Sequence, residues 1–136
     1  MQTKSSLNTS ESVKKVPVIV VEAAVLLDAD WDNDGIFDAI WIITTSQKTA
    51  ELRLIAIRGM EEKDAIQRIE AQKCRRGMGN PDIELRDGNI NKIILNDYPA
   101  ASSEENEDSD KILLKSLQAA LIDPSCWKDG RSLCAL

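Results

Sequence analysis

The stretch that most constrains this chain runs from Asp28 to Asp38, where five aspartates fall within eleven residues. An apolar run lies on each side, which indicates a loop between two core segments. No lysine or arginine lies inside this loop. Carboxylates held within about 4–6 Å of one another raise each other's pKa and destabilise the fold. The loop therefore either surrounds a cation or is an ordinary acidic turn in water.

Counted from Asp30, the spacing of the acids matches that of a calcium loop. Acids fall at loop positions 1, 3, 5 and 9, and Gly35 at position 6 permits the sharp turn. A count from Asp28 would put Asn33 at the glycine position, so we expect Asp28 outside the ligand shell. The predicted ligands of a structural Ca²⁺ ion are the side chains of Asp30, Asp32, Asp34 and Asp38 and the backbone carbonyl of Ile36.

The loop differs from an EF-hand, because Trp41 stands where an EF-hand carries a bidentate glutamate. Residues 38–45 are β-branched and aromatic, which predicts a strand. A D-x-D-x-D-G-x-x-D loop that enters a strand resembles the calcium loops of integrin-type (FG-GAP/VCBS) repeats, over residues 28–58. The resemblance implies ligand roles for the same four aspartates. A propeller needs several such repeats and this chain has one copy, so the adhesive functions of that family are not expected.

A second resemblance points to an enzyme. Residues 32–40 resemble the calcium and ribose motif of nucleoside hydrolases, in which paired aspartates open a helix, and residues 79–85 resemble that family's next β-α-β unit. Here the pair would be Phe37-Asp38, so one ligand is missing, and the chain is much shorter than that fold. The resemblance implies a degenerate or fragmentary relative. A helix after Asp38 would favour it, and a strand would favour the integrin-type loop.

A third interpretation uses Asp28 and Asp30 alone. An apolar segment followed by D-x-D is a form that holds a divalent metal in phosphoryl and glycosyl transfer. The lysine and hydroxyl residues that support such chemistry do not stand at matching positions. We therefore rank it below the other two.

Composition excludes several classes of function. The 136 residues contain no histidine, which removes histidine acid–base chemistry, Ser-His-Asp triads and most catalytic zinc sites. The net charge of −6 disfavours nucleic acid and anionic membranes as partners. The longest apolar run, residues 16–27, is too short to span a bilayer and contains Glu22. We expect a small non-enzymatic domain that binds an unidentified protein partner.

The remaining pattern predicts one α+β domain over residues 14–136, after a disordered segment 1–13. Its antiparallel sheet would comprise two hairpins, with strands at 38–45 and 51–58 and at 82–86 and 90–95. Residues 16–27 predict a further core strand. Two main helices are expected at 61–76 and 110–122, the second after an acidic flexible linker at 99–110.

The cysteines indicate in which cellular compartment the protein is located. Cys126 and Cys134 flank the turn at Asp129-Gly130, and a disulfide between them would stabilise the fold by roughly 2.5 kcal/mol. Cys74 is expected to be buried on a helix. A disulfide and a calcium loop of modest affinity both suit a periplasmic or extracellular protein, so we expect that location, with the signal peptide absent from this chain.

Overall fold

A two-stranded parallel sheet forms the centre of the molecule. The computed structural model describes residues 17–97 and 106–130. Strand β1 (Trp41–Thr44) pairs with β2 (Lys92–Leu95), so that Trp41 lies opposite Lys92 and Thr44 opposite Leu95. Three helices separate the strands along the chain, as a parallel pair requires. In chain order the helices are α1 (Gln47–Arg58), α2 (Glu62–Gln72), α3 (Pro81–Arg86) and, after β2, α4 (Asn106–Ile122).

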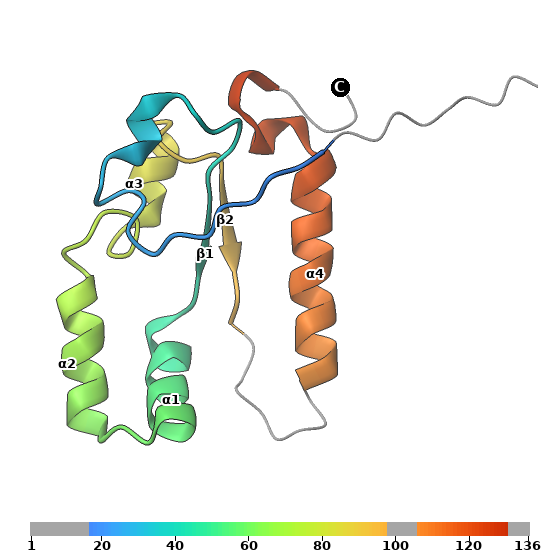
Figure 1. The fold of residues 1–136 in the computed structure, drawn as a ribbon. Coiled ribbons are helices and arrows are strands. Elements are labelled where there is room, and N and C mark those ends of the chain that lie inside the picture. Colours follow the sequence, from blue (N-terminus) through green and yellow to red (C-terminus); the bar gives the residue numbers. More distant parts are fainter. Residues whose placement is uncertain (1–16, 98–105, 131–136) are drawn as a thin grey trace, which may run out of the picture.

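The helices lie on both sides of the sheet. Figure 1 shows α1 and α2 side by side at one side of the strands and α4 alongside β2 at the other. Three short 3₁₀ turns complete the described elements: Trp31–Asp34 in the aspartate loop, and Pro124–Cys126 and Lys128–Gly130 after α4. None of the described helices is both long and apolar enough to cross a bilayer.

The predicted antiparallel sheet of two hairpins is wrong, and the first hairpin fails because residues 51–58 belong to α1. The Ser46 hydroxyl accepts the Thr49 N–H at 3.3 Å and caps the helix start. Gly59 ends the helix with φ 64°, and its N–H donates to the Ile55 carbonyl. The residues between these caps are mostly strong helix formers, so capping and propensity outweigh the apolar run that suggested a strand.

The second predicted hairpin fails for a similar reason. Residues 82–86 form α3, with Pro81 in the first turn, where its missing N–H costs nothing. The Asp87-Gly88-Asn89 sequence ends this helix instead of joining two strands. The other half of the predicted hairpin, residues 90–95, contains β2.

Other predicted elements have mixed outcomes. The strand predicted at 38–45 contains β1, and the helix predicted at 61–76 contains α2. Helix α4 begins at Asn106, earlier than the predicted start at 110. The core strand predicted at 16–27 is wrong, because the described part forms no strand and its valines are exposed. Residues 1–13 and 99–105 lie outside the described residues.

The main core is small and lies next to the aspartate loop. Leu27, Ile40 and Ile90 are its buried residues. A second contact joins the segment after α4 to the sheet. The rings of Trp41 and Trp127 meet edge to face with their centroids 5.8 Å apart, and the Trp41 indole N–H donates to the Cys126 carbonyl at 2.7 Å. The core therefore fixes the aspartate loop against β1 and the start of β2.

The cysteine predictions divide. Cys74 is exposed, past the end of α2, so its predicted burial on a helix is wrong. Cys126 is buried, but Cys134 lies outside the described residues. The disulfide between them therefore stays a prediction.

Candidate functional site

The aspartate loop forms a compact turn. Asp30 has a left-handed backbone with φ 58°, a 3₁₀ turn follows, and Gly35 reverses the chain with φ 66°. Of the predicted ligands, Asp30 and Asp32 are brought together. Within the described residues, the side chains of Asp34 and Asp38 make no hydrogen bond or ion pair, and Ile36 is exposed. Residues 17–97 and 106–130 contain no group of three or more acids or cysteines placed to hold a metal.

An arginine lies where the acids meet. The Nη1 atom of Arg76 donates to the Leu27 carbonyl at 2.8 Å, to Asp30 Oδ1 at 2.8 Å and to Asp32 Oδ1 at 3.2 Å. Its Nη2 atom donates to Asp32 Oδ2 and to Glu84 Oε2, both at 2.9 Å, and its Nε donates to Glu84 Oε1 at 3.2 Å. One guanidinium therefore joins the loop, the turn after α2 and helix α3.

The carboxylates that contact Arg76 differ in exposure from Arg76 itself. The Asp32 side chain is 1% exposed and that of Glu84 10%, whereas Arg76 is 32% exposed. Hydrogen bonds with Glu84 and then Asp32 raise the pKa of Arg76 above its ordinary value. The same guanidinium lowers the pKa of Glu84, which also accepts from the Asn89 amide at 2.8 Å. Arginine suits this position because its planar fork binds two carboxylates in bidentate fashion.

The turn after α2 places Arg76. The Arg76 backbone N–H donates to Asp28 Oδ1 at 3.1 Å, so Asp28 anchors the backbone of this turn. Gly77 follows with φ 75°, and a side chain there would meet Leu27 and Ile42. Gly79 packs still closer, because an added Cβ would lie 1.8 Å from the Lys73 carbonyl oxygen. Two glycines thus let the turn pack tightly enough for Arg76 to reach the loop.

Arg76 was missed as a functional residue. The sequence predicts a cation for the acidic loop but offers none nearby, and Arg76 lies 44 positions after Asp32. At the end of the predicted helix, the Arg75-Arg76 pair fits a solvated helix end better than an anion-binding site. The excess of acidic residues in one segment indicates that a cation lies nearby. It does not identify which distant residue supplies that cation.

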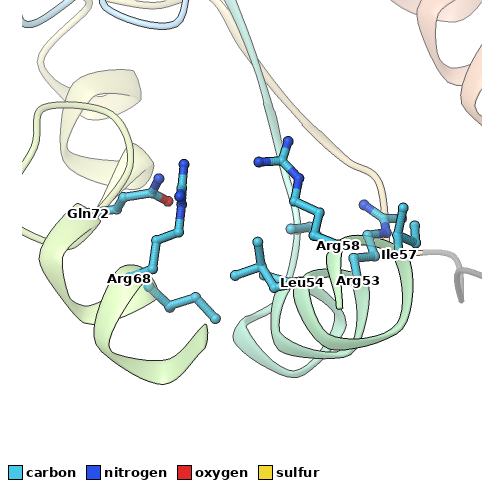
Figure 2. Close-up of a pocket in the computed structure, with 9 residues that line it drawn as sticks. Arg53, Leu54, Ile57, Arg58, Arg68 and Gln72 are labelled. Atoms are coloured by element: carbon cyan, nitrogen blue, oxygen red, sulfur yellow. The ribbon is translucent and has the colours of Figure 1, made fainter. Parts of the chain in front are cut away.

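A second site lies between α1 and α2. A pocket of about 440 Å³ opens there, and its lining combines three arginines with apolar side chains such as Leu54 and Ile57 (Figure 2). Arg58 and Arg68 have no ion-pair partner among the described residues. The third, Arg53, donates from Nη2 to the Asn96 carbonyl at 3.0 Å. The lining residues are Thr45, Ala50, Arg53, Leu54, Ile57, Arg58, Arg68, Ile69 and Gln72.

The charge of this pocket is opposite to that of the whole chain. No aspartate or glutamate lines it, although the chain carries a net charge of −6. Guanidinium groups bind carboxylate and phosphate oxygens strongly, and an apolar floor retains the hydrocarbon part of a ligand. Sequence reasoning missed this site because it placed Arg53 and Arg58 on a strand.

Comparison with known proteins assigns neither a family nor a function to the chain. No protein-family model matches the chain, and neither the curated proteins nor the solved structures include a similar one. The element that follows Asp38 is a strand, β1, and not a helix. Both resemblances stay predictions that rest on their motif residues.

Proposed function

We propose that the protein is a small non-enzymatic binding module, and that the pocket between α1 and α2 holds an acidic, partly apolar segment of a partner protein. The observation that carries this proposal is a pocket that combines Arg58 and Arg68, which have no ion-pair partner among the described residues, with apolar side chains and no carboxylate. The lining offers guanidinium, amide and hydroxyl groups but no general base, so it suits binding rather than catalysis.

The geometry favours a peptide over a small free anion. Arg68 and Gln72 come from α2, and Arg58 comes from α1, so polar groups lie on both sides of the pocket (Figure 2). Leu54, Ile57 and other apolar side chains form much of the surface. An acidic helix or loop with interspersed leucines satisfies both features, because carboxylates meet the arginines while apolar side chains cover the floor.

Peptide titration tests this proposal. The probe is a short peptide that alternates glutamate with leucine, and fluorescence anisotropy measures its affinity. Replacing Arg58 and Arg68 together by glutamine should weaken binding at least about tenfold, since each charge-assisted hydrogen bond contributes roughly 1.5–3 kcal/mol. Added salt should weaken binding as well.

Two controls make the result specific. Replacing Lys48 and Lys63 by glutamine removes the same charge from exposed positions outside the pocket, and it should change affinity by less than about threefold. A peptide with glutamine in place of every glutamate should not bind. Equal binding of both peptides, or equal loss in both double variants, would contradict the proposal.

Binding of a structural calcium ion by the aspartate loop is the second candidate function of the protein. Five loop acids and Glu84 carry more negative charge than Arg75 and Arg76, the cations that contact them, can neutralise. The acids do not converge in the described arrangement, so calcium binding requires Arg76 to release Asp30 and Asp32.

Calorimetric titration with calcium and magnesium tests that role. Replacing Arg76 by glutamine should raise calcium affinity at least about tenfold, because a unit charge some 4 Å away opposes the ion by about 1–4 kcal/mol. Adding Asp34→Ala to that variant should abolish the gain. No heat at millimolar calcium in any of these proteins would refute the calcium loop.

A further inference from the structure

The described part of the chain begins with an exposed apolar segment. Residues 17–21 read Pro-Val-Ile-Val-Val, and Ile19 and Val20 are 91% and 84% exposed. β-branched residues of this kind favour strands. Among the described residues, no backbone group of this segment has a backbone hydrogen-bond partner. In Figure 1 the segment runs across the strands rather than along them.

A groove follows the free edge of β2. It measures about 540 Å³ and lies between β2 and α4. All four β2 residues line it, and because successive strand residues point to opposite faces, such a groove must follow the edge of the strand. The other edge of β2 pairs with β1, so this edge has no ladder partner among the described strands. Helix α4 cannot provide one, because its backbone groups bond within the helix.

We propose that this groove binds residues 17–21 of a second copy of the chain, which add a strand to β2. Each copy would donate one segment and accept one, giving a closed, twofold-symmetric dimer. A free strand edge and an exposed β-branched segment in the same chain are the two components that strand exchange needs.

Charge selects the direction of the added strand. Lys92 lies at one end of the groove and Asp97 at the other. Hydrogen bonds from the Ser46 hydroxyl and N–H lower the pKa of Asp97 to about 2, so this carboxylate is charged at neutral pH. In the sequence, Glu22 follows the segment directly. An antiparallel strand places Glu22 toward Lys92, whereas a parallel strand would place it beside the like charge of Asp97.

Two single variants should each abolish the dimer by a different route. Ile19→Asp puts a charge into the donated strand, and Ala119→Arg fills the groove from α4. Both residues are exposed, so neither change disturbs the core of one copy. Gln118→Arg is the control. It adds the same charge at the residue immediately before Ala119, and Gln118 does not line the groove.

Mass measurement by light scattering after size exclusion gives the result. The wild type and Gln118→Arg should have twice the mass of the 15.1 kDa chain, and each single groove or segment variant the mass of one. An equimolar mixture of Ile19→Asp and Ala119→Arg should recover dimer, since the Ala119→Arg copy has an intact segment and the Ile19→Asp copy an intact groove. A monomeric wild type, a dimeric Ala119→Arg protein or a mixture that stays monomeric would overturn the proposal. A monomeric wild type would mean that residues 17–21 bind the groove of their own copy or bind no groove.

Discussion

Replacing Arg76 by methionine is expected to lower the free energy of unfolding by about 2–3 kcal/mol. Removing one partner of a fully buried ion pair costs about 3–5 kcal/mol, because the remaining charge stays in a poorly solvated site. Asp32 and Glu84 would be left in that state, with side chains 1% and 10% exposed. The 32% exposure of Arg76 lets water reach the vacated position, which reduces the loss. Equilibrium unfolding in urea, followed by tryptophan fluorescence, measures the change.

Arg75 supplies the matched control for this experiment. It is the adjacent residue with the same side chain, and its contact with Asp28 is long, at 3.8 Å, and solvent-exposed. Arg75→Met should therefore cost less than about 0.5 kcal/mol. A similar loss in both variants would show that the contacts of Arg76 with the acidic loop contribute no more to stability than an exposed ion pair.

Replacing Gly79 by alanine should destabilise the fold by about 3 kcal/mol or more. The added Cβ would lie 1.8 Å from the Lys73 carbonyl oxygen, which is backbone and cannot rotate away. Overpacking commonly costs about 1–3 kcal/mol, and a backbone contact of this kind belongs at or above the upper end. The turn that places Arg76 would have to shift, so thermal unfolding should show a large drop in midpoint temperature.

Gly35 separates this steric effect from the general cost of replacing a glycine. It has φ 66°, and an added Cβ there would meet nothing within 4 Å. Gly35→Ala should therefore cost only the backbone penalty of about 1–2 kcal/mol. A Gly79→Ala protein as stable as the wild type would contradict the tight turn after α2.

The acidic loop shows what sequence can and cannot predict here. Five carboxylates close together in the sequence predict a positive group near the loop, and in the structure Arg76 contacts two of them, Asp30 and Asp32. The carboxylates do not identify this group, because a calcium ion and a guanidinium satisfy the same oxygens. The deciding contact joins Asp32 to Arg76, and no local pattern connects two such distant positions. The sequence therefore indicates that the carboxylates repel one another, but it does not indicate that Arg76 is the residue that contacts them.

The sheet was mispredicted for a different reason. Apolar residues at 51–58 fit either a strand or one face of a helix, and a short run does not separate them. The Ser46 cap and the Gly59 stop were visible signals for the helix, and they outweigh the run. Because residues 47–58 form a helix, Arg53 and Arg58 line a pocket together with residues of α2. One wrongly predicted element thus concealed both the parallel sheet and the arginine pocket.

A double-mutant cycle between Arg76 and Asp32 tests most directly whether the arginine is the loop's cation. The four proteins are the wild type, Arg76→Met, Asp32→Asn and the double variant, all unfolded in urea with a calcium chelator present. A direct pair in a shared network predicts a coupling energy of about 1–3 kcal/mol. Additive losses, with coupling below about 0.5 kcal/mol, would show that Arg76 does not neutralise the aspartate loop.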